Sequence, residues 1–96
     1  MEVLITYDVS TESSSGRRRL RQVAKLLEGH GQRVQKSVFE CIVNPEQLEV
    51  LVHRLTRIID TEMDSLRVYR LREPRERFVR IVGQKPAFDP REPMIV

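Results

Sequence analysis

The apolar residues of this 96-residue chain change their spacing several times, and the order of these changes restricts how the chain can fold. In residues 1–9 apolar side chains lie on both faces of an extended segment, as in a central strand. Residues 20–27 follow helical spacing up to a pair of glycines, and residues 33–43 are rich in β-branched and aromatic residues. On this pattern alone, residues 33–43 form one long strand.

A second helix is predicted to begin at Asn44 and Pro45. Asn44 has the side chain of a helix cap, Pro45 suits the first helical position, and Gln47 is placed to close a capping box. Apolar residues then recur at helical spacing over residues 48–59. One face of this helix is therefore expected to pack against the core.

Two short strands, residues 66–71 and 78–82, are predicted to follow the second helix. The resulting order of elements predicts an α+β fold in which a layer of helices covers one face of a mostly antiparallel sheet. A break of the 33–43 run near Lys36 and Ser37, where it changes from polar to apolar, would produce the ferredoxin-like βαββαβ order. This change in polarity is the only evidence in the sequence for such a break.

The length of the chain predicts one small domain, because no segment long enough to be a linker divides it. Such a domain buries only about 60 to 65% of the surface that its unfolded chain exposes, so we expect a dimer that adds stability. The single cysteine, Cys41, excludes an intrachain disulfide. Without a secretory signal or an apolar run of membrane-spanning length, the expected location is the cytoplasm, with no membrane partner.

The positive charge is concentrated in one part of the chain. Residues 16–36 contain seven basic residues and one acidic residue, whereas the net charge of the whole chain is only +3. A local basic block is typical of proteins that contact phosphate, although runs of arginine also occur on helix faces that are merely solvated. We expect phosphate binding here.

Asp8 is the carboxylate that stands out, because it ends an apolar strand and precedes a Ser-rich loop. A hard cation such as Mg²⁺ prefers oxygen ligands, and bound metal can activate water in phosphodiester cleavage. Spacing alone favours the alternative that Asp8 caps the loop by accepting backbone hydrogen bonds. One carboxylate is a poor metal site, but two copies of Asp8 facing each other across a two-fold axis would supply two.

The remaining candidate residues have simpler explanations. Core packing explains Tyr7 better than contact with a substrate, and a place in the core or in a dimer interface explains Phe39 better than stacking on a base, because both lie within apolar strands. His30 and His53 have too few companions for a zinc site, so we expect them at the surface. Cys41 lacks an identifiable base and is expected in the core as a small hydrophobic residue.

Three segments together resemble a known family. They are LITYDV at residues 4–9, RLRQVAKLL at residues 19–27 and GQRVQKSVFEC at residues 31–41. These segments and their spacing are similar to those of the small CRISPR-associated endonucleases of the spacer-acquisition machinery, the Cas-two family. The C-terminal DPREPMIV resembles the version found with type I-C systems.

The resemblance implies a ferredoxin-like βαββαβ sandwich over residues 1–82, with the 33–43 run split into two strands. It also implies a homodimer with an additional C-terminal strand, in which the tail at residues 83–96 docks on the partner protomer or on the Cas-one integrase. These implications replace the single long strand that the pattern favours.

The resemblance also implies which residues carry the function. Asp8 is the implied ligand of Mg²⁺, with Mn²⁺ as a substitute, and one copy comes from each protomer. Tyr7 is expected to act with Asp8 in catalysis. The residues expected to bind nucleic acid are Arg17, Arg19, Arg21, Arg33 and Phe39.

Members of the family are described as metal-dependent nucleases acting on single-stranded RNA or double-stranded DNA, and also as non-catalytic bridges between integrase dimers. For this chain we expect a homodimer in spacer acquisition that binds duplex DNA and bridges the integrase, with metal-dependent phosphodiesterase activity. The alternatives are a toxin-like metal-dependent endoribonuclease outside CRISPR systems and a non-catalytic nucleic-acid-binding module.

Overall fold

The structure, a computed structural model, describes residues 1–83. The proposed docking of the C-terminal tail lies outside the described residues, apart from Gly83. The elements in chain order are β1 (Glu2–Asp8), α1 (Ser14–Glu28), β2 (Gly31–Gln35), β3 (Val38–Ile42), α2 (Pro45–Ile58), β4 (Ser65–Leu71) and α3 (Arg75–Phe78). No helix within this range is both long and apolar enough to cross a bilayer.

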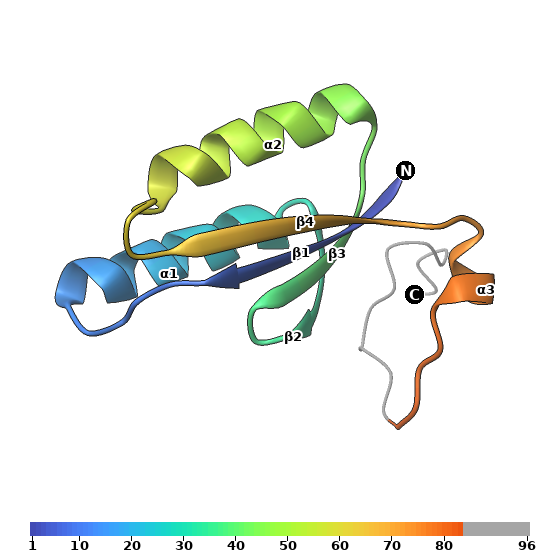
Figure 1. Cartoon of the computed structure of the whole chain (residues 1–96), viewed down its shortest axis with the longest axis horizontal. Coiled ribbons are helices and arrows are strands. Elements are labelled where there is room, and N and C mark those ends of the chain that lie inside the picture. The colour runs from blue at the N-terminus through green and yellow to red at the C-terminus, as the bar shows by residue number, and fades with distance from the viewer. Residues whose placement is uncertain (84–96) are drawn as a thin grey trace.

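The four strands form one antiparallel sheet in the order β2-β3-β1-β4, with α1 and α2 layered against it (Figure 1). This arrangement confirms the predicted α+β class and the antiparallel sheet. The strand that begins the chain, β1, is central, and it pairs with β3 on one side and β4 on the other.

One face of β1 forms the centre of the core. Val3, Ile5 and Tyr7 alternate along the strand and are buried. Cross-strand neighbours share a face of the sheet, and Ile5 is paired with Phe39 of β3, which is also buried. The helices cover this face with the buried residues Val23, Leu27, Leu51 and Leu55. The opposite face, which carries Leu4, Thr6 and Asp8, is turned away from α1 and α2.

Local capping explains where the helices begin. The Ser13 side chain accepts a hydrogen bond from the Gly16 N–H at 3.0 Å and so caps α1. At α2 the Asn44 side chain accepts from the Gln47 N–H at 2.7 Å, and the Gln47 side chain accepts from the Asn44 N–H at 2.9 Å. The predicted capping box at Asn44 is confirmed.

The single long strand predicted from the 33–43 pattern is wrong. A turn at Lys36 and Ser37 separates β2 from β3, as the family resemblance implies. The Tyr7 hydroxyl donates to the Lys36 carbonyl at 3.1 Å, and the Tyr7 N–H donates to the Ser37 carbonyl at 3.1 Å. The turn is therefore held by β1, a strand far from this run in the sequence.

The strand predicted at residues 78–82 is not formed. Pro74 precedes the short helix α3, which ends at Phe78, and residues 79–83 belong to no strand of the described chain. The Val79 backbone is extended, with φ −122° and ψ 123°, but a strand also needs a neighbour that supplies hydrogen bonds. Arg75 of α3 instead makes a two-bond ion pair with Glu40 of β3, at 2.6 and 2.9 Å.

Candidate functional site

Asp8 is exposed at the end of β1, on the sheet face opposite the helices. It is paired in the sheet with Ser65, the first residue of β4. Within the part of the chain that the structure describes, the Asp8 carboxylate makes no hydrogen bond or ion pair. Its oxygens are therefore available to a ligand from outside the chain.

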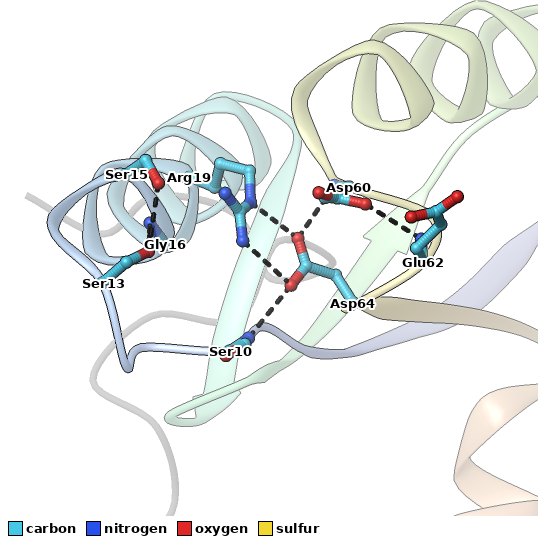
Figure 2. Close-up of polar contacts among 8 residues, drawn as sticks. All are labelled: Ser10, Ser13, Ser15, Gly16, Arg19, Asp60, Glu62 and Asp64. Atoms are coloured by element: carbon cyan, nitrogen blue, oxygen red, sulfur yellow. Dashed lines mark hydrogen bonds and ion pairs between the residues drawn. The ribbon is translucent and has the colours of Figure 1, made fainter.

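The loop after β1 is held by Asp64, not by Asp8. The Ser10 N–H donates to Asp64 Oδ1 at 3.0 Å, and the Asp60 N–H donates to Asp64 Oδ2 at 2.9 Å (Figure 2). The loop-capping role considered for Asp8 thus belongs to Asp64, a residue that the sequence did not single out. Nothing in its local sequence distinguishes Asp64 from Asp60 or Glu62.

Arg19 completes this cluster from α1. Its Nε donates to Asp64 Oδ2 at 2.8 Å, and its Nη2 donates to Asp64 Oδ1 at 3.4 Å. The Arg19 side chain is 15% exposed and that of Asp64 is 0% exposed. Burial raises the pKa of Asp64, but the hydrogen bonds from Arg19, Asp60 and Ser10 together outweigh burial and lower it. Asp64 is therefore an ionised carboxylate paired inside the fold.

The two aromatic candidates lie in the core. Phe39 is 0% exposed, and its ring stacks on that of Tyr7 at a centroid distance of 6.3 Å. The contact with nucleic acid that the family resemblance implies for Phe39 is not available in this structure, because no part of the ring reaches the surface. Tyr7 is also buried, and burial raises the pKa of its hydroxyl. The core role considered for both residues is the one that the structure shows.

The arginines predicted to bind nucleic acid occupy different environments. Arg17 and Arg21 are exposed on α1, where Arg17 also donates to the Thr11 carbonyl at 3.3 Å. Arg33 on β2 is exposed, forms an ion pair with Glu28 at 3.5 Å and lies over the Phe39 ring. Arg19 differs from all three, because its guanidinium is already bound to Asp64.

The exposed surface of α1 is basic. Arg18, Arg21 and Lys25 recur at helical spacing, so they lie on one side of the helix, and Arg17 precedes them. We call Arg17, Arg18, Arg21 and Lys25 the α1 basic face. None of the three spaced residues makes an ion pair within residues 1–83, so this face is free to meet phosphate.

The described residues contain no group of three or more His, Cys, Asp and Glu side chains that could hold a metal ion. His30 and His53 are both exposed, as predicted. Cys41 is buried, and burial raises the pKa of its thiol to about 11, which confirms the prediction of a core residue. Within residues 1–83, Asp8 is therefore an exposed carboxylate that belongs to no such group.

The sequence matches that of known proteins along its whole length. Residues 1–78 match the family described as "CRISPR associated protein Cas2". The "CRISPR-associated endoribonuclease Cas2 1" of Moorella thermoacetica is 52% identical over 96 residues, which are 100% of both chains. The "CRISPR-associated endonuclease Cas2" of Halalkalibacterium halodurans is 54% identical over 95 residues, which are 99% of both chains.

The fold is also similar to solved structures. The crystal structure of Streptococcus pyogenes Cas2 superposes with a TM-score of 0.78 at 54% identity, covering 86% of this chain and 100% of that one. A hypothetical protein from Thermus thermophilus superposes with a TM-score of 0.73 at 33% identity, covering 88% of this chain and 93% of that one. Sequence and fold agree with the family resemblance of the three segments, and the chain belongs to the Cas2 family of CRISPR-associated proteins.

Proposed function

We propose that this protein acts in CRISPR spacer acquisition as a homodimer that binds duplex DNA, bridges the Cas-one integrase and has metal-dependent phosphodiesterase activity on double-stranded DNA or single-stranded RNA. The observation that carries the catalytic part is Asp8, an exposed carboxylate without a partner in the described chain. The names of the relatives, which are those of CRISPR-associated endonucleases and endoribonucleases, support this activity over a toxin-like role outside CRISPR systems.

Asp8 fits a hard divalent cation in the chemistry of its donor atoms. Mg²⁺ takes carboxylate oxygens, keeps several waters and is held by one or two carboxylates together with substrate phosphates. Mn²⁺ takes the same type of ligand. When bound, the ion activates water or stabilises the leaving oxygen. A two-fold dimer that brings two copies of Asp8 together would supply the second carboxylate that one chain lacks.

The homodimer is supported by the apolar surface of the described chain. The sheet face without helices carries Leu4, Ile42 and Tyr69, because Leu4 is an open-face residue of β1, Tyr69 is its partner on β4, and Ile42 is the β3 partner of Glu2 on the same face. Ile42 and Tyr69 are exposed, and so are Phe78 and Val82 after β4. A second copy would cover these side chains and supply the strand neighbour that residues 78–82 lack.

The element order β1-α1-β2-β3-α2-β4 and the strand order β2-β3-β1-β4 support a ferredoxin-like sandwich for each protomer. The α1 basic face supports binding to duplex phosphates in either the nuclease or the bridging role. We assign this chain to the type I-C version of the family on its C-terminal DPREPMIV. The tail at residues 83–96, which contains this segment, would dock on the partner protomer or on the integrase.

The test is cleavage of labelled duplex DNA and single-stranded RNA with Mg²⁺, Mn²⁺ or chelator. Wild type is compared with Asp8→Asn, which removes the charge at constant size, and with Glu49→Gln, which removes an exposed carboxylate on α2. We expect cleavage to require both metal and Asp8 and to survive Glu49→Gln. Equal cleavage by wild type and Asp8→Asn would rule out the catalytic assignment and leave the bridging role.

A further inference from the structure

We propose that Asp64 and Arg19 are positioning residues for Asp8, and that Arg19 contributes to activity through Asp64 and not by contact with nucleic acid. The inference rests on the proposed function of Asp8. The Asp64 network consists of Asp64, Arg19, Ser10 and Asp60, which come from three segments: the β1–α1 loop, α1 and the α2–β4 loop (Figure 2).

The Asp64 carboxylate is saturated by donors within the fold. It accepts one hydrogen bond from Ser10, two from Arg19 and one from Asp60, which matches the roughly four acceptor positions of a carboxylate. Its side chain is fully buried, where hydrogen bonds to a charged group are strongest. The carboxylate therefore joins the β1–α1 loop, α1 and the loop after α2 at a single point.

The backbone at Ser10 is confined from a second side. Gly16 lies in the first turn of α1, and a Cβ added there would collide with the Ser10 carbonyl oxygen. Only glycine permits this approach between the helix and the loop. The Ser10 N–H is thus held by Asp64, and its carbonyl group packs directly against α1.

The Asp64 network is connected to Asp8 through the backbone at two points. Ser10 follows Asp8 by two residues, so the bond from Ser10 to Asp64 restricts where the chain goes after β1. Asp64 directly precedes Ser65, which is the sheet partner of Asp8. The same carboxylate therefore restricts the end of β1 and the start of β4, the two backbone segments that set the position of Asp8.

Arg19 is poorly placed to meet a phosphate. Two of its nitrogens are used by Asp64, and its side chain is mostly buried, whereas Arg18 and Arg21 on the same helix are exposed. Removal of the Arg19 guanidinium would leave a buried carboxylate without its counter-charge, and the network would rearrange around it. If replacing Arg19 lowers kcat, the cause is then displacement of Asp8, since small misplacements of a reacting group cost up to about 100-fold in rate.

A double-mutant cycle in the full-length protein tests the inference. The variants are Arg19→Gln, Asp64→Asn and the pair together, with Arg54→Gln as a control that removes an exposed arginine from α2. The readouts are kcat for cleavage, the dependence of duplex affinity on salt, and the exchange rate of the Ser10 amide hydrogen. Arg21→Gln, a member of the α1 basic face, is the comparison for the salt dependence.

We expect each single variant to lower kcat by about tenfold or more, and the double variant to be no worse than the more impaired single variant, because both act on one network. Ser10 exchange should accelerate about tenfold in both single variants, since its acceptor is removed or displaced. Arg19→Gln should leave the slope of log affinity against log salt unchanged, and Arg21→Gln should reduce it by about 0.9.

Independent effects that add in the double variant, or a flatter salt slope for Arg19→Gln, would make Arg19 a phosphate-binding residue and overturn the inference. Unchanged Ser10 exchange in both single variants would overturn it as well. If wild type does not cleave, the proposed function of Asp8 fails, while the exchange rate and the salt slope still decide the role of the network. If Arg19→Gln does not fold at the assay temperature, Arg19→Lys takes its place; it keeps the counter-charge but loses the two-bond geometry, so the same directions of change are expected with smaller magnitudes.

Discussion

The hydroxyl of Tyr7 lies 3.1 Å from the main-chain carbonyl of Lys36, so a side chain of the central strand holds the turn between β2 and β3. The ring of the same residue stacks on Phe39, the next aromatic in the core. Tyr7 is adjacent to Asp8 in sequence, but successive side chains of a strand point to opposite faces of the sheet. The two residues therefore serve different parts of the molecule.

Replacing Tyr7 by Phe should separate structure from catalysis at this position. The substitution removes the bond to Lys36 and keeps the ring, so we expect the free energy of unfolding to fall by about 1 kcal/mol and kcat to stay the same. Denaturant unfolding and the cleavage assay are the measurements. A large fall in kcat in a fully folded Tyr7→Phe protein would restore Tyr7 as a catalytic residue.

Placing a charge on the open sheet face should weaken the proposed dimer. Ile42→Lys introduces an ammonium group at an exposed position of β3 opposite Glu2, so the monomer should tolerate it while association becomes weaker by at least about tenfold. Val50→Lys makes the same change at an exposed position of α2 and serves as the control. Sedimentation over a range of concentrations measures the dimer dissociation constant of each variant. Equal constants for the two variants would argue against this face as the interface.

Adding a methyl group at Gly16 should disturb the loop after Asp8. Because the new Cβ would meet the Ser10 carbonyl oxygen, Gly16→Ala should lower the free energy of unfolding by about 2 kcal/mol and reduce cleavage. Gly29→Ala is a useful comparison, since a Cβ there meets only ordinary van der Waals contact, 3.5 Å from the Leu26 carbonyl oxygen. If both variants behaved alike, the close approach at Gly16 would have no special role.

Neutralising the α1 basic face should make duplex binding less sensitive to salt. For Arg18→Gln with Arg21→Gln we expect the slope of log affinity against log salt to fall by about 0.9 for each phosphate that the face no longer neutralises. Arg54→Gln with Arg57→Gln removes the same charge from exposed positions on α2. An equal change in both double variants would mean that net charge, and not the α1 basic face, determines the slope.

Stability in acid should depend on Asp64. The pKa of Asp64 in the folded protein is below its ordinary value of 3.8, so its ionised form stabilises the fold above that pH, and this contribution is lost as pH falls through the lower, folded pKa. The melting temperatures of wild type and Asp64→Asn should therefore differ near neutral pH and converge as the pH falls below about 4. A difference that stays constant down to about pH 2 would show that Asp64 does not titrate in this way.

The elements that the sequence predicted well depend on neighbours in the chain. The capping box of Asn44 and Gln47 joins residues three apart, and the burial of Val3 and Ile5 follows from simple alternation. The break at Lys36 and Ser37 depends instead on Tyr7, which lies 29 residues before Lys36. This dependence explains why the local pattern predicted one strand where the structure has two.

The difference between local and long-range contacts also explains which residues of the candidate site could be predicted from the sequence. Asp8 could be selected because the change from apolar strand to polar loop is local. Asp64 could not, because its hydrogen bond to Ser10 spans 54 residues and three neighbouring acidic residues look alike in sequence. The environment of Arg19 follows from that of Asp64, so neither the basic block nor the family resemblance could predict its internal ion pair.

The central position of β1 also bears on how the protein is made. Residues 2–8 leave the ribosome before their strand partners, which are residues 38–42 on one side and residues 65–71 on the other. During translation the apolar β1 segment must therefore wait for most of the chain before both its edges are paired. Exposed strand edges favour aggregation, so growing chains of this protein are candidates for protection by chaperones until β4 has emerged.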